Sequence, residues 1–117
     1  MTPDELKDGT KQFGLRVIRL VESLPKTKTA TVIGNQLLRC ATSVGANYRA
    51  ACRGRSKAEF IAKLGIVEEE ADESAYWLEM LIEAKVLKPD LVTQLHTEAE
   101  ELTAIMAKSR QTAKQKK

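Results

Sequence analysis

Aromatic residues, glycine and proline are all scarce: aromatics make up only 4% of the 117 residues, beside 6 glycines and 3 prolines. A chain with so few β-forming and turn-forming residues is unlike a protein of many short strands, and its composition favours helices. No apolar run approaches the roughly 18 residues that a membrane-spanning helix requires. No charged-then-apolar leader opens the chain, so we expect a cytoplasmic protein without a membrane partner.

Cysteine and histidine are also scarce, since the chain holds only Cys40, Cys52 and His96. On one helix the two cysteines would lie about 18 Å apart along the axis, which is too far for a disulfide. Two reduced, packed thiols suit a cytoplasmic protein. A di-iron site in a helical bundle needs two Glu-x-x-His pairs, and the residue three before the single histidine is Thr93. The sequence therefore predicts no metal site.

Motifs of catalytic loops are missing as well. The sequence has no glycine-rich phosphate loop and no G-x-S-x-G elbow. The acidic residues of the run 68–73 fall on several faces of a helix, so most of them are expected to be solvated. A pairing of a cysteine with His96 in space stays open, but packed thiols are the favoured interpretation. We therefore expect no enzyme, no cofactor and no small-molecule substrate.

The sequence does contain four segments with apolar residues at helical spacing. They predict helices over about 4–24, 29–53, 57–84 and 89–108, joined by short connectors. Short connectors make consecutive helices antiparallel, so the predicted fold is an all-α, up-down-up-down four-helix bundle over residues 1–108. After Lys108 the apolar pattern fades. Residues 109–117 are therefore expected to form a basic, frayed or disordered tail.

Capping signals mark the predicted helix starts. Thr2 or Asp4 is placed to cap the first helix. Ser56 and Glu59 match the S-x-x-E capping box, in which the serine accepts from a backbone N–H and the glutamate reaches back to the cap. Phe60 follows at once and begins the apolar stripe of the third helix. This position predicts a helix start at residue 57.

Small and polar residues interrupt the second helix. Gly34 and Gly45 each cost roughly 1 kcal/mol relative to alanine, which suggests that another backbone approaches closely there. Ser43 and Asn47 fall near its inner stripe, where a buried asparagine can fix helix register. A ligand-binding role is the less favoured alternative for both. Gly54 fits the position just past the helix end.

Charge is segregated along the chain, although the net charge is only +3. Residues 39–63 hold six basic residues against one glutamate, and residues 68–83 hold seven acidic residues and no basic one. Arginines in one outward row of the second helix are suited to neutralise phosphates. The alternatives are a solvated face, or salt bridges to the acidic third helix. The nucleic-acid-binding candidates are Arg39, Arg49, Arg53, Arg55 and Lys57.

The third predicted helix is apolar on two sides. Its main stripe repeats at alternating steps of three and four, as a bundle seam requires. Measured from Ala71, a second set of apolar residues points away from that seam, which predicts contact with a neighbouring subunit. Glu73 lies about one turn before the aromatic pair and is assigned to the same contact. The oligomer-interface candidates are Ile66, Glu73, Tyr76, Trp77 and Met80.

Three runs of sequence carry a family resemblance. The runs LRCATSVGANY at 38–48, RGRSKAEF at 53–60 and EADESAYWLE at 70–79 resemble bacterial four-helix-bundle proteins encoded in intervening sequences of 23S ribosomal RNA genes. The resemblance implies a left-handed bundle, commonly assembled as a ring-shaped homopentamer, and brings no established activity. A related branch, the accessory proteins of diversity-generating retroelements, is basic and engages a reverse transcriptase and nucleic acid. By analogy, RNA or a ribonucleoprotein becomes the expected partner.

The function predicted from these observations is a non-enzymatic, oligomeric scaffold. It would present repeated basic patches to RNA or to a ribonucleoprotein. The alternative is a protein-interaction module that binds no nucleic acid. In that alternative, the basic helix over 29–53 pairs with the acidic helix over 57–84 across subunits.

Overall fold

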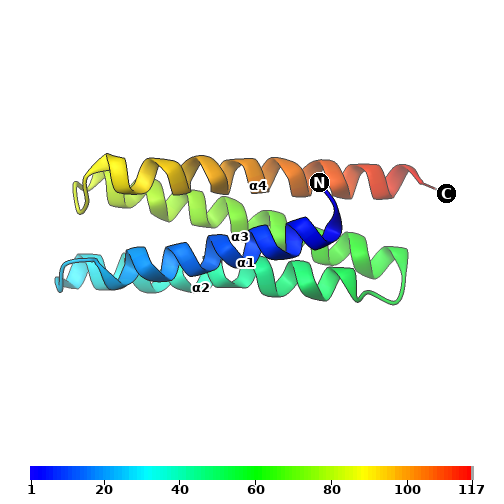
Figure 1. The fold of residues 1–117 in the computed structure, drawn as a ribbon, viewed down its shortest axis with the longest axis horizontal. Coiled ribbons are helices and arrows are strands. Elements are labelled where there is room, and N and C mark those ends of the chain that lie inside the picture. The colour runs from blue at the N-terminus through cyan, green and yellow to red at the C-terminus, as the bar shows by residue number, and fades with distance from the viewer. Residues whose placement is uncertain (117) are drawn as a thin grey trace.

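Four long helices account for most of residues 1–116, the part of the chain that the computed structural model describes. They are α1 (Pro3–Glu22), α2 (Lys28–Cys52), α3 (Lys57–Glu83) and α4 (Pro89–Gln115). Figure 1 shows them side by side, with the chain direction reversing from each helix to the next. The prediction of an all-α, antiparallel four-helix bundle is confirmed. None of the four helices has the length and apolar character to cross a bilayer.

The core lies where the apolar stripes of the four helices meet. Burying each large side chain there contributes roughly 1.5–3 kcal/mol, so the stripes hold the bundle together far more than helix propensity does. Every helix contributes large residues whose side chains are fully buried. Among them are Phe13, Val17, Leu37, Val44, Leu64, Leu78, Val92 and Met106.

The helix starts follow the capping signals, with one difference. Thr2 caps α1 in a complete box: its hydroxyl accepts from the Glu5 N–H at 3.1 Å, and the Glu5 carboxylate accepts from the Thr2 N–H at 3.0 Å. Ser56 caps α3 as predicted and accepts from the Glu59 N–H at 3.1 Å. The Glu59 carboxylate, however, accepts from the Arg55 N–H at 3.5 Å. The capping box at α3 is thus only half formed.

The two glycines within α2 have different neighbours. A Cβ at Gly45 would lie 3.4 Å from backbone atoms of Thr10 and Lys11, so α1 and α2 do approach closely there. A Cβ at Gly34 would meet side chains instead, with the Leu24 Cδ1 at 2.9 Å. The predicted backbone approach is therefore right for Gly45 and wrong for Gly34.

Ser43 and Asn47 bond within their own helix. The Ser43 hydroxyl donates to the Arg39 carbonyl at 2.8 Å, and the Asn47 amide donates to the Ser43 carbonyl at 2.9 Å. Both side chains are half-buried. They lie at the edge of the inner stripe, where the helix's own carbonyls are the nearest acceptors. The hydrogen bonds of these two side chains therefore do not fix the register between helices, contrary to the prediction.

The last helix is longer than its apolar stripe. α4 continues to Gln115, where the sequence predicted a frayed tail from residue 109. Arg110 contributes to this end by donating two hydrogen bonds to the Glu68 carboxylate of α3, at 2.6 and 3.1 Å. An ion pair of this kind leaves no trace in an apolar pattern. Lys117 lies outside the described residues.

The helices are not equally close to one another. α1 packs closely on α2, α2 on α3, and α3 on α4, whereas α1 and α4 contact each other sparsely. The bundle is therefore more open along its α1–α4 side.

Candidate nucleic-acid interface

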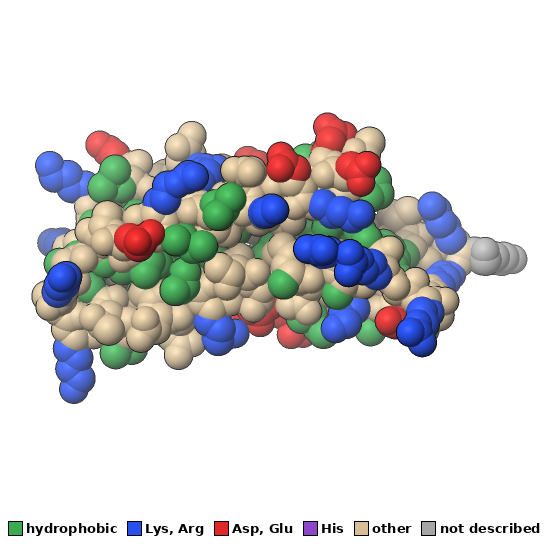
Figure 2. Space-filling view, turned by 60° about the horizontal axis from the view of Figure 1, so that its bottom comes forward, with side chains coloured by type: hydrophobic (Ala, Val, Ile, Leu, Met, Phe, Trp, Pro, Cys, Tyr) green, Lys and Arg blue, Asp and Glu red, His purple; other side chains and the backbone are tan. Residues whose placement is uncertain are grey.

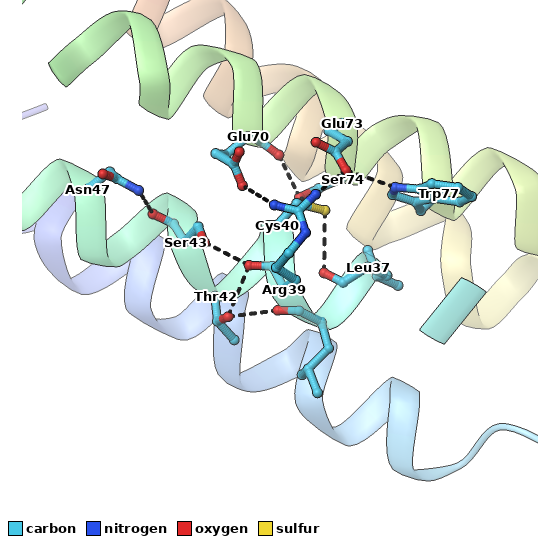
Figure 3. Close-up of polar contacts among 11 residues, drawn as sticks. Leu37, Arg39, Cys40, Thr42, Ser43, Asn47, Glu70, Glu73, Ser74 and Trp77 are labelled. Carbon is cyan, nitrogen blue, oxygen red and sulfur yellow. Dashed lines mark hydrogen bonds and ion pairs between the residues drawn. The ribbon is translucent and has the colours of Figure 1, made fainter. Parts of the chain in front are cut away.

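The hairpin of α2 and α3 positions the basic residues that the sequence singled out. Because the two helices run antiparallel from one connector, residues at broadly similar distances from that connector face each other. Cys40 and Ser74 show this register, since the Ser74 hydroxyl contacts the Cys40 sulfur at 3.3 Å (Figure 3). Burial, first of all, raises the pKa of the Cys40 thiol. This thiol is packed between helices and is not placed to react.

Arg39 meets the acidic run of α3 within the same chain. Its guanidinium pairs with Glu70 at 3.3 Å and with Glu73, whose carboxylate also accepts from the Trp77 indole N–H at 3.1 Å (Figure 3). The Trp77 hydrogen bond, followed by the Arg39 pair, lowers the pKa of Glu73. The hydrogen bond and charge of Glu73 raise the pKa of Arg39. Arg39 is thus engaged with two carboxylates of its own subunit.

Four other basic residues lie together where α2 ends and α3 begins. Arg49 from α2, Arg53 and Arg55 from the connector and Lys63 from α3 line one shallow groove of about 440 Å³. Within residues 1–116 none of these four side chains forms an ion pair, although Glu59 lies in the same groove. We call these four residues the basic groove. Figure 2 shows Lys and Arg side chains gathered on the half of this face nearer the C-terminal end.

The basic groove differs from the predicted set by two residues besides Arg39. Lys57 lines a different cleft, between α1 and α4, and Lys63 takes part although sequence reasoning did not select it. The antiparallel register contained the missing signal. Arg49 and Lys63 lie at similar distances from the connector, just as Arg39 and Glu73 do farther out. Aligning the two predicted helices as an antiparallel pair would have placed Lys63 beside Arg49.

The predicted interface residues of α3 divide into two kinds. Ile66 and Tyr76 are exposed, by 39% and 51%. Trp77 and Met80, predicted to point away from the core, are partly buried against it. The reason is that α3 packs against both α2 and α4, so that two of its sides are buried within one chain. Glu73 is engaged by Arg39 and Trp77.

The other acidic residues of α3 that form ion pairs reach α4. Glu68 pairs with Arg110, and Glu79 contacts the His96 imidazole at 2.8 Å. Glu100 lies 3.3 Å from the other nitrogen of that ring. In the described part of the chain, no group of three or more His, Cys, Asp or Glu residues is arranged to hold a metal ion. The acidic helix thus connects α2 on one side to α4 on the other.

Comparison with known proteins places this arrangement in a family. Residues 6–108 match the family described as 23S rRNA-intervening sequence protein. A crystal structure of a protein with unknown function from the S23 ribosomal protein family of Bacteroides thetaiotaomicron VPI-5482 is 32% identical and superposes with a TM-score of 0.87, covering 95% of this chain and 99% of that one. The curated proteins contain no match to the chain. The family match spans most of the bundle, including both helices that form the basic groove, and the chain belongs to the family of 23S rRNA-intervening sequence proteins.

Proposed function

We propose that this protein is an oligomeric scaffold that binds the phosphate backbone of RNA through the basic groove. The observation that carries the proposal is the convergence of Arg49, Arg53, Arg55 and Lys63 on one groove without a paired carboxylate for any of them. A guanidinium holds a phosphate through two parallel N–H bonds, and a lysine adds a point charge.

The proposed contact is to phosphates and not to bases. Backbone contacts of this kind position a nucleic acid but carry little sequence information. Neutralising four phosphates should make the affinity fall with salt, with a logarithmic slope of roughly 3 to 4. One groove with four cations is a weak site. Repetition of the groove in a homo-oligomer would multiply weak contacts into useful avidity.

The ion pairs of the acidic residues of α3 help to decide between RNA binding and the alternative, a protein-interaction module that binds no nucleic acid. That alternative pairs the arginines of α2 with the acids of α3 across subunits. Arg39 has both of its carboxylate partners in its own chain. The basic groove lies nearer the connector, where Glu59 is the acidic residue that lines it. These contacts favour the RNA proposal.

Electrophoretic mobility shift with a structured RNA, at low and moderate salt, tests the proposal. Reversing two charges with Arg49→Glu and Arg53→Glu should weaken binding by at least about tenfold at low salt, because each replaces a phosphate contact by a repulsion. The control carries the same charge change at the other end of the bundle, with Lys26→Glu and Lys28→Glu. Both of those side chains are exposed.

Two outcomes would count against the proposal. The first is an absence of RNA binding by the folded wild-type protein at low salt. The second is equal weakening by the two double variants, which would show that net charge acts and the basic groove does not. The oligomeric state of each variant is measured in parallel, so that lost avidity is not taken for a lost contact.

A further inference from the structure

One corner of the bundle is left open at the end that carries the chain termini. α3 and α4 extend to this end, whereas α1 begins and α2 ends before reaching it (Figure 1). Residues of all four helices border an open corner of the bundle there. The space forms a cleft of about 940 Å³ between α1 and α4.

The floor of this cleft is apolar. The Phe60 and Ile105 side chains are only partly buried and face the cleft, over a deeper layer that includes the Tyr48 ring. Burial and the neighbouring Cys52 thiol raise the pKa of Tyr48, so its phenol stays neutral and acts as part of the apolar floor. The floor consists of Leu6, Tyr48, Ala51, Phe60 and Ile105.

The charged side chains that line the cleft are all basic. Lysines border it from α1, from the start of α3 and from the end of α4, and its described lining includes no aspartate or glutamate. The rim lysines are Lys7, Lys57, Lys108 and Lys116. Lys7 lies 3.8 Å from the Asp4 carboxylate, whereas the other three lysines form no ion pair within residues 1–116. An apolar floor inside a rim of lysines matches a ligand that is apolar on one side and acidic on the other.

The face of α4 that borders the cleft has the length of a short helix. From Ile105 to Lys116 the lining residues recur at steps of three and four, so they share one face over three turns. At 1.5 Å per residue this face is about 16 Å long. A helix of three turns lying antiparallel or parallel to α4 would extend along all of it.

We propose that this cleft, at the open corner of the bundle, binds an acidic amphipathic helix of a partner protein. Apolar side chains at helical spacing pack on Phe60 and Ile105, and carboxylates on the outer side of the helix reach the rim lysines. Charge complementarity selects the acidic partner, and the three-turn face of α4 along the cleft selects the helical shape. The inference is independent of RNA binding, because the cleft and the basic groove have no lining residue in common.

Fluorescence anisotropy with a labelled peptide of 14 residues tests the charge and shape together. The peptide carries leucines at steps of three and four and glutamates elsewhere. It should bind the full-length protein, and a peptide with lysine in place of every glutamate should bind at least about tenfold more weakly. A scrambled acidic peptide without helical spacing should lose binding to a similar extent. Equal binding of all three peptides would overturn the proposal.

Variants then locate the site. Lys7→Glu and Lys108→Glu together should weaken the acidic peptide about tenfold or more, because both lysines border the cleft. The control pair Lys26→Glu and Lys28→Glu changes the net charge equally at the far end of the bundle and should leave the peptide affinity within about twofold. Unchanged affinity in the Lys7 and Lys108 variant would overturn the proposal.

Cys52 provides a readout inside the cleft itself. Its thiol lines the cleft and is half-buried, whereas Cys40 is fully buried between helices. Alkylation of the native protein should therefore report on Cys52, and saturating acidic peptide should slow it severalfold. Bound peptide that leaves the rate of Cys52 alkylation unchanged would place the peptide elsewhere and refute the proposal.

Peptide binding by the variant designed to lose RNA separates this inference from the proposed function. The acidic peptide should still bind the Arg49→Glu and Arg53→Glu variant, since those residues do not line the cleft. If that variant lost RNA and peptide together while remaining folded, the cleft would be part of the RNA site and the partner-helix proposal would fail. Loss of RNA alone leaves the helix proposal standing, and loss of peptide alone leaves the RNA proposal standing.

Discussion

At the scale of single residues, Glu73 is the most heavily engaged side chain on the surface of α3. It accepts from the Trp77 indole and pairs with Arg39, and its side chain remains 35% exposed. Solvent weakens a pair this exposed, so we assign it about 0.5–1 kcal/mol. Because Glu73 lies on α3 and Arg39 on α2, the pair links these two helices at a fixed register.

Glu73→Gln should lower the free energy of unfolding by about 0.5–1 kcal/mol at pH 7. The folded pKa of Glu73 is lowered, so the folded state binds fewer protons than the unfolded state in acid. The stabilisation is therefore present above the unfolded pKa near 4.3 and disappears as the pH falls through the folded pKa. Urea unfolding from pH 7 to pH 3 should show wild type and variant converging.

Glu69→Gln is the matched control, since Glu69 is exposed on the same helix and forms no ion pair in the described structure. That substitution should change stability little at any pH. A difference between wild type and Glu73→Gln that stays constant across the pH range would show that the carboxylate charge is not the cause.

Residue-level pairing is where sequence reasoning reached its limit. Helical spacing placed Arg39, Arg49 and Arg53 on the outside of α2, and all three are exposed. Spacing within one helix cannot say which residue of the next helix lies opposite. The antiparallel register brings carboxylates to Arg39 and a lysine to the neighbourhood of Arg49, so one arginine is neutralised while the other stays available.

At the scale of helices, the residues that follow α2 and α3 are subject to two different constraints, one of space and one of backbone conformation. Gly54 follows α2 without a positive φ, so its need for glycine is one of space. A Cβ there would lie 3.1 Å from the Ala51 carbonyl oxygen and 3.3 Å from the Phe60 nitrogen. Lys85 follows α3 with φ 56°, a left-handed conformation that favours glycine.

Gly54→Ala should destabilise the protein by about 1–3 kcal/mol, because both close neighbours are backbone atoms of the tight connector. Gly9→Ala provides the contrast. A Cβ at Gly9 would meet nothing within 4 Å, so alanine there should stabilise α1 by about 0.5–1 kcal/mol. Thermal or urea unfolding measures both changes, and destabilisation of equal size at the two sites would contradict the spatial argument.

Lys85→Gly should raise the free energy of unfolding by about 0.5–1 kcal/mol, because glycine adopts the left-handed conformation without the steric cost of a Cβ. The surrounding bonds are already in place: the Val86 N–H donates to the Leu81 carbonyl, and the Lys85 N–H donates to the Ile82 carbonyl, each at 3.0 Å. Lys85→Ala keeps the Cβ and should change stability little. A gain from alanine as large as that from glycine would assign the effect to the lysine side chain instead.

The existence and order of the helices could be predicted because each carries its own apolar stripe. The stripes did not show which helices cover the two apolar sides of α3. The sequence assigned Trp77 and Met80 to a neighbouring subunit, but α3 has α2 on one side and α4 on the other. A stripe reports that a face is buried and does not report which helix buries it.

At the scale of the whole molecule, the bundle is a rod of 50 × 20 × 19 Å, and one of its ends carries two hollows lined by basic residues. The basic groove and the α1–α4 cleft both lie near that end, on different sides. The open corner was beyond prediction, because the stripes of α1 and α4 indicate inward faces without fixing how far apart two non-consecutive helices lie. The length of α4 depends likewise on Arg110 and its partner on α3.

Exposed apolar residues on α3 remain the candidates for subunit contact. Ile66 and Tyr76 are the two apolar members of the predicted set that are exposed, and the Tyr76 ring packs edge-on against Trp77 at 5.0 Å between centroids. Aromatic residues held rigidly by a neighbour are frequent anchors of protein interfaces. These two positions therefore carry the oligomer proposal, which no longer depends on Trp77 pointing outward.

Light scattering coupled to gel filtration should give a mass that is a multiple of the 13.0 kDa chain, and the family resemblance suggests five copies. Replacing both anchors, with Ile66→Ser and Tyr76→Ser, should shift the mass toward the single chain, because the apolar contact area is lost while the core is untouched. The matched control replaces two other exposed apolar residues, with Val32→Ser and Leu91→Ser, which are 52% and 58% exposed. A wild-type monomer would refute the oligomer and leave each basic groove to act alone. An oligomer that only the control pair disrupts would move the interface from α3 to the starts of α2 and α4.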